Sequence, residues 1–219
     1  MSFGKQWAFI LPAATAVLLM LALVLAGAYS AADEKGLHRV YAHRSLSGWG
    51  VENGQVVDIQ YNMATTGPFP GWYYGLPLIA CTALFITVVY WTLRRTALAA
   101  RPTAPELFDV DTAIRSLRTR FVMAVSSAAL GFQIAGVGAV TGVALLNANL
   151  EPVPTVDLYG VPSTIEIEPG YTLAILLILV SLAIAVATVT LLVRAVATAL
   201  KVVSATRSIE NQVVPQATL

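Results

Sequence analysis

The two histidines of the chain, His38 and His43, are the first candidates for chemistry, because imidazole is a common metal ligand and general base. Carboxylates that could complete a metal site lie near them in the sequence: Asp33, Glu34 and Glu52. A spacing of five residues, however, puts the two rings on opposite faces of a continuous strand, and no HxxxH or Cys/His pattern accompanies them. We therefore expect no metal site and no cofactor.

A nucleophilic site can be assembled on paper from Ser45, His43 and Asp58, but nearness in sequence does not establish a nucleophile and its base. Cys81 is the single cysteine and lies within a long apolar run, so we expect it to be a small core residue. The sequence contains no phosphate-binding loop and no dinucleotide-binding fingerprint. An enzyme is therefore the weakest of the functional hypotheses.

The elements that would have to position such residues are strongly apolar. Hydrophobic residues make up 57% of the 219 residues and charged residues 11%, against roughly a quarter in ordinary soluble domains. A bilayer core needs about 20 apolar residues to be crossed by a helix. Four stretches without any charged residue exceed that length: 7–32, 72–93, 121–150 and 171–193. The sequence predicts a mainly α membrane protein built as a four-transmembrane-helix bundle.

We predict a single integral membrane domain over residues 1–219. Its expected segments are transmembrane helices at about 7–30, 71–94, 113–148 and 170–208, external loops at about 31–70 and 149–169, a cytoplasmic loop at about 95–112, and a tail at about 209–219. The first apolar run exceeds the roughly 7–15 residues of a signal peptide core, so we expect it to remain as a membrane helix. The fourth helix should continue past the membrane, because no Gly or Pro interrupts residues 171–208.

The basic residues predict the orientation. Ten of the thirteen Lys and Arg residues would lie on the same side as both termini, and the other three are Lys35, Arg39 and Arg44. Because basic loops stay in the cytoplasm, both termini should be cytoplasmic. Five arginines beside the spans are expected to contact anionic lipid headgroups: Arg94, Arg95, Arg115, Arg118 and Arg120.

The third span has the composition of a contact helix. Small residues let helix backbones approach closely in lipid, where packing replaces the hydrophobic drive. The candidate contact residues are Ser127, Gly131, Gln133, Ala135, Gly138 and Gly142, of which the last two form a GxxxG pair. Gln133 needs a hydrogen-bond partner near mid-membrane. Packing within the bundle, an interface with another chain and a Gln-lined substrate site are the three alternatives.

The first external loop carries a hairpin signal. Residues 37–44, 50–52 and 55–61 are expected to be extended, and Asn53-Gly54 is a dipeptide typical of a two-residue hairpin turn. In the third connection, residues 155–159 and 163–168 have a strand pattern as well. We expect both loops to contribute to one small extracytoplasmic β-cap.

A four-span layout with an external sheet resembles, in outline, that of claudin-like proteins. Those proteins carry paired external cysteines near a tryptophan motif, whereas Trp49 stands in Ser-Gly-Trp-Gly with no cysteine in either loop. The lack of disulfides and of Asn-x-Ser/Thr sites, together with Ala- and Val-rich helices, favours a bacterial inner membrane.

None of the four uncharged runs contains Asp, Glu, Lys, Arg or His, whereas ion-coupled transporters and proton pumps usually need such groups at membrane depth. The leading hypothesis is a non-catalytic integral subunit or accessory protein of a larger bacterial membrane complex, either a transporter or a respiratory assembly. The alternatives are a self-associating pore or small-molecule carrier, and a membrane-embedded enzyme. The expected partners are the lipid bilayer and other integral membrane proteins or further copies of the chain, and no nucleic acid.

Overall fold

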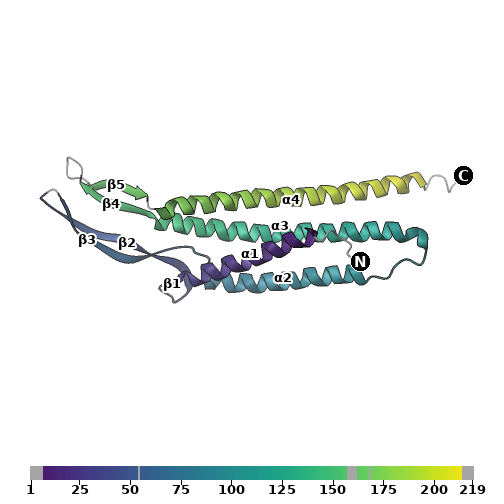
Figure 1. The fold of residues 1–219 in the computed structure, drawn as a ribbon, viewed down its shortest axis with the longest axis horizontal. Coiled ribbons are helices and arrows are strands. Elements are labelled where there is room, and N and C mark those ends of the chain that lie inside the picture. The colour runs from purple at the N-terminus through teal and green to yellow at the C-terminus, as the bar shows by residue number, and fades with distance from the viewer. Residues whose placement is uncertain (1–6, 54, 157–161, 168, 214–219) are drawn as a thin grey trace. The chain divides into compact units, whose positions relative to one another are not determined.

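The computed structural model describes residues 7–53, 55–156, 162–167 and 169–213. Its helices are α1 (Trp7–Ala28), α2 (Trp72–Leu98), α3 (Phe108–Ala148) and α4 (Pro169–Val213), as Figure 1 shows. Each of the four is long and apolar enough to cross a membrane. The predicted class, a mainly helical protein with four candidate spans, is therefore confirmed.

The chain forms two compact units, and each unit contains a segment of every helix. Unit 1 comprises Met1–Ala16, Leu84–Phe132 and Ala185–Leu219. Unit 2 comprises Val17–Ala83 and Gln133–Ile184, and it includes all the strands described. The sites discussed below each lie within one of these units.

The helix ends follow local sequence signals. A 3-10 turn, η1 (Pro105–Leu107), leads directly into α3 at Phe108. Asp109 and Asp111 therefore lie inside the first turn of α3, where the helix dipole favours negative charge. Helix α4 runs without interruption for 45 residues, or about 67 Å at helical rise, as the missing breakers predicted.

The first external loop forms a three-stranded antiparallel sheet in the order β1 (Ser30–Ala32), β2 (His38–Glu52) and β3 (Gln55–Thr66). Glu52 pairs with Gln55 across the predicted hairpin turn, and Asn53 has the positive φ of 52° that such a turn requires. Gly54, the other half of the turn signal, lies outside the described residues. The strands are longer than expected, because β2 continues through register shifts on either side of Gly48.

The third connection forms a separate antiparallel hairpin of β4 (Leu150–Val156) and β5 (Pro162–Ile167). The expected strand at 155–159 begins earlier than predicted, and residues 157–161 lie outside the described part of the chain. Among the strands described, β4 pairs with β5 and not with the first sheet. The two loops therefore form separate hydrogen-bonded sheets, although β4 lies beside β2 and β3 within unit 2.

The first sheet is anchored to the helices of unit 2 by one aromatic side chain. Phe69 is 2% exposed and packs with Ala26 of α1 and Ala144 of α3, and Tyr41 of β2 covers the same cluster. The Tyr41 and Phe69 rings lie 5.4 Å apart, and the Phe69 amide donates to the Arg39 carbonyl. The position of the sheet within unit 2 thus depends on this apolar cluster.

Candidate functional site

The small-residue face of α3 lies against α4. In unit 2, a Cβ added to Gly142 would lie 2.6 Å from Ile178 Cγ1 and 3.2 Å from the Ala174 carbonyl oxygen. A Cβ at Gly138 would meet the Ser181 hydroxyl. The absence of side chains at these two positions therefore allows the backbones of α3 and α4 to approach closely.

The same relation holds in unit 1, where a Cβ added to Gly131 would meet the Thr188 hydroxyl of α4. The other small candidates have different surroundings. The Ser127 hydroxyl donates to the Met123 carbonyl of its own helix at 2.9 Å, and Ala135 is 6% exposed. The glycines of the predicted contact face thus serve packing between α3 and α4 within this chain.

Gln133 meets a partner on α2. Its side-chain Oε1 lies 3.0 Å from Thr82 Oγ1, and Thr82 is fully buried. The same hydroxyl lies 2.7 Å from the Leu78 carbonyl oxygen. A hydroxyl has one proton, so it donates to one of these two acceptors at a time. The Thr82–Gln133 pair links α2 to α3 and leaves part of the Gln133 amide facing a groove.

That groove has a volume of about 500 Å³ and is lined by α1, α2 and α3 of unit 2 together with Pro68 and Pro70. Apart from the Gln133 amide and the Tyr74 phenol, its wall is apolar, with Leu23 and Val137 among the lining residues. One amide and one phenol are too few polar groups for a water-filled path. The hydroxyls of Ser126, Thr141 and Ser181 donate to carbonyls four residues earlier in their own helices.

A second groove of about 540 Å³ runs along α3 between α1 and α4 in unit 2. It is lined by Leu18 and Ala22 of α1, by Leu177 and Val180 of α4, and by Gly138 of α3 with its neighbours. Val180 is 45% exposed, so the groove opens laterally rather than being enclosed. A groove of this kind can receive the side chains of another helix.

The arginines expected at lipid headgroups divide into two kinds. Arg94, Arg95, Arg118 and Arg120 are exposed, and the Arg95 guanidinium lies 4.0 Å from the centre of the Trp91 ring. Arg115 differs from the expectation, because its residue is 5% exposed and its guanidinium is engaged within the protein. The headgroup role requires exposure, which Arg115 lacks.

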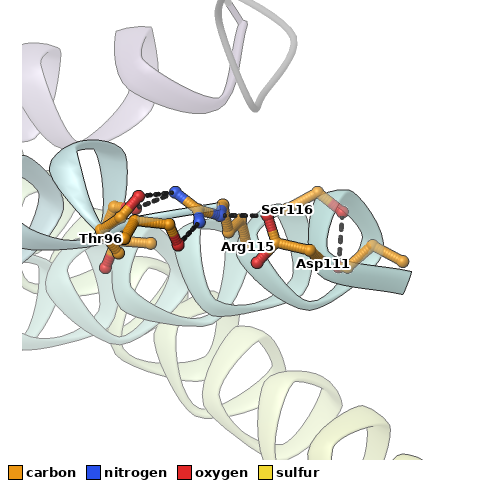
Figure 2. A network of polar contacts seen from close by, with 7 residues as sticks. Thr96, Asp111, Arg115 and Ser116 are labelled. Carbon is orange, nitrogen blue, oxygen red and sulfur yellow. Dashed lines mark hydrogen bonds and ion pairs between the residues drawn. The ribbon is translucent and has the colours of Figure 1, made fainter. Parts of the chain in front are cut away.

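Arg115 instead closes the end of α2, as Figure 2 shows. Its Nη1 donates to the carbonyls of Thr96 at 3.2 Å and Ala99 at 2.9 Å, and its Nη2 donates to the Ala100 carbonyl at 2.9 Å. Its Nε donates to Asp111 Oδ2 at 2.8 Å, one turn earlier on α3. A fork of N–H donors suits this task, because the last carbonyls of a helix have no partners within it.

The sequence missed this network although its ingredients were visible. Asp111 and Arg115 have the i, i+4 spacing of a helical ion pair, and a pair of this kind is usually a solvated surface feature. What makes it structural is its position beside the C-terminus of α2, which spacing along α3 does not reveal.

The histidine candidates do not come together. His38 Nδ1 lies 3.2 Å from the Ser30 carbonyl oxygen, whereas the His43 ring stacks with Tyr41 at 6.5 Å between centroids. Nδ1 of His43 is buried without a hydrogen-bond partner among the described residues. Within that part of the chain, no group of three His, Cys, Asp or Glu residues is arranged to hold a metal ion.

The Ser45–His43–Asp58 combination is also not assembled. His43 pairs with Ala64 on β3, and Asp58 lies six residues before Ala64 on that strand, which is roughly 20 Å at strand rise. Asp58 has a positive φ of 53°, which marks an irregular position in the hairpin. These three side chains therefore do not form a nucleophile, base and orienting acid.

A polar turn between β1 and β2 holds the most perturbed titratable pair outside the spans. Asp33 Oδ1 accepts hydrogen bonds from the Leu37 and Lys35 amides, each at 2.9 Å, and Asp33 also pairs with Arg39. The Leu37 bond, followed by the Arg39 contact, lowers the pKa of Asp33 below its usual value. The hydrogen bond to Asp33 correspondingly raises the pKa of Arg39. This pair stabilises the turn, and the Arg39 guanidinium also lies over the Tyr73 ring, 5.9 Å from its centre.

Comparison of the chain with protein-family models, with curated proteins and with solved structures finds no match.

Proposed function

We propose that the chain is a non-catalytic integral subunit or accessory protein of a larger membrane complex. Four helices of sufficient length and apolarity support its insertion in a membrane. The excess of arginine and lysine beside both termini supports a cytoplasmic location for both ends, and a bacterial inner membrane fits the same composition. The subunit would contribute helices and a small external sheet to an assembly, such as a transporter or a respiratory complex, whose chemistry resides in other chains.

The lateral groove along α3 in unit 2 carries this proposal. Gly131 and Gly142, which the sequence offered for association, already face α4, so a partner needs a surface beside that contact. The groove between α1 and α4 offers about 540 Å³ of apolar space, enough to receive a row of side chains from one helix. Because hydrocarbon gives no hydrophobic drive for association, such a concave surface gains van der Waals contact that lipid chains fill less well.

A site-specific photo-crosslinking experiment in native membranes tests the proposal. The crosslinking amino acid is placed at Val180, which lines the groove, or at Leu182, which is exposed on the same helix but does not line it. We expect Val180 to give one discrete adduct with a different integral protein in fixed proportion, and Leu182 to give none. Equal labelling from both positions contradicts the proposal.

The mass of the adduct distinguishes the alternative. An adduct of twice the mass of this 23.2 kDa chain would indicate self-association and would favour the pore or carrier hypothesis instead. Co-purification in mild detergent gives an independent measurement, since an accessory subunit should be recovered with its partner in a constant ratio. Recovery of a monomer alone from native membranes overturns the proposed role.

A further inference from the structure

Two arginines on neighbouring helices of unit 1 line a single groove. Arg120 belongs to α3 and Arg194 to α4, and both face a groove of about 310 Å³ between these helices. The remaining wall is mostly apolar, with Phe121 and Leu191 as its largest side chains. None of the residues that line it is acidic. The groove therefore combines two positive charges with an apolar floor.

Both arginines lie where a charged segment of the helix meets its uncharged run. Arg120 immediately precedes the uncharged run of α3, and Arg194 immediately follows the uncharged run of α4. Helix α3 continues from Arg120 into its apolar run through Ala124, and α4 reaches Arg194 from its apolar run through Leu191. The groove thus holds both arginines, and Ala124 and Leu191 lead from them along the apolar runs of α3 and α4.

We propose that this groove binds one anionic glycerophospholipid, with its phosphate between Arg120 and Arg194 and an acyl chain along Phe121 and Leu191. Guanidinium groups present planar pairs of donors that match phosphate oxygens. A headgroup with net negative charge is favoured because two cations face the groove without a lining carboxylate. The apolar floor selects a lipid over a free phosphate ion, which could use the arginines alone.

The proposal differs from general attraction of basic residues to a membrane surface. Arg118 lies on the same helix, only two positions from Arg120, and is also exposed, yet it does not line the groove. A diffuse electrostatic effect treats Arg118 and Arg120 alike, whereas a built site distinguishes them. Arg118 therefore provides the matched control.

Native mass spectrometry of the full chain in detergent micelles measures the bound lipid directly. Phosphatidylglycerol and phosphatidylcholine with identical acyl chains are added in equal amounts. We expect the unmodified chain to retain one phosphatidylglycerol in preference to phosphatidylcholine. Replacing both arginines (Arg120→Gln with Arg194→Gln) should weaken phosphatidylglycerol binding roughly thirtyfold, at about a tenfold or smaller loss per cation. Arg118→Gln should change binding less than about twofold.

A second pair of variants tests the apolar part of the site without altering charge. Ala195→Phe fills the groove, whereas Ala197→Phe adds the same ring to an exposed position that does not line it. We expect only the first to displace phosphatidylglycerol. Circular dichroism confirms that all variants keep their helix content.

Three results would overturn the lipid site: equal retention of both lipids by the unmodified chain, equal losses for the Arg118 variant and the double variant, or complete displacement of the lipid by millimolar inorganic phosphate. The last outcome would assign the arginines to a phosphate ion. None of these results bears on the partner groove of unit 2, so the two proposals fail separately.

Discussion

Replacement of Arg115 by methionine tests the role assigned to this side chain at the end of α2. Methionine keeps an unbranched apolar stem and removes every donor of the guanidinium. The Thr96 carbonyl is then left without its donor in a buried position, since Thr96 is 6% exposed. The carbonyls of Ala99 and Ala100 lie at exposed residues, where water replaces the lost bonds.

The expected cost follows from these unequal surroundings. One unsatisfied buried carbonyl costs about 1–3 kcal/mol, whereas the two exposed carbonyls together lose less than about 1 kcal/mol. The Asp111 carboxylate, whose side chain is 22% exposed, loses a partly buried ion pair and recovers part of its hydration, for a further loss of about 1 kcal/mol. Arg115→Met should therefore lower the free energy of unfolding by about 3 kcal/mol.

Unfolding of the detergent-solubilised chain by sodium dodecyl sulfate, followed by circular dichroism, measures this difference. Arg118→Met is the control, because it removes the same charge from an exposed site on α3 and should change stability by less than about 0.5 kcal/mol. Arg115→Lys should recover only part of the lost stability, since one ammonium cannot reach both the carbonyls at the end of α2 and the Asp111 carboxylate. Equal stability of the Arg115→Met and Arg118→Met variants refutes the reasoning, as does complete recovery by lysine.

Three other predictions concern packing, pH and topology. Gly142→Ala should lower the free energy of unfolding by about 1–3 kcal/mol, because its new methyl group meets Ile178 and backbone atoms of α4. Gly136→Ala places its methyl group in open space and should raise the free energy of unfolding by up to about 1 kcal/mol. The same unfolding titration compares the two variants, and a similar loss at both sites contradicts the α3–α4 contact. Because the pKa of Asp33 is lowered in the folded chain, its bond to the Leu37 amide contributes stability above the unfolded value near 3.8 and is lost as the pH falls through the folded pKa. The protection factor of the Leu37 amide, which is its exchange rate corrected for the pH dependence of intrinsic exchange, should fall on acidification in the unmodified chain. In Asp33→Asn the protection factor should be lower and independent of that titration, and an unchanged profile would refute the assignment. A fluorescent reporter that matures only in the cytoplasm, fused after the last residue, should be bright, and a signal only from an export-dependent reporter would invert the proposed orientation.

Helices and turns were within reach of the sequence because their signals are local. Apolar runs longer than a bilayer core, the lack of breakers after residue 171 and the Asn53-Gly54 dipeptide each describe a short segment that needs no distant partner to be recognised. All four helices and the first hairpin appear where these signals put them. The ends of elements were less well predicted, because Gly48 permits β2 to continue through irregular pairing and η1 moves the start of α3 to Phe108.

The sequence by itself determined the helical class, the four candidate spans and the uneven placement of charge. Only the tertiary structure decided what the side chains between those features do. The sequence placed Arg115 beside a span and identified the glycine face of α3, but it could not say that the guanidinium binds carbonyls at the end of α2 or that the glycines face α4. The physical reason is that donors, acceptors and close backbone contacts are completed by residues on another helix, and local propensity carries no information about which helix that is. The grooves beside Val180 and between Arg120 and Arg194 exist for the same reason, since each is bounded by segments that are distant in the chain.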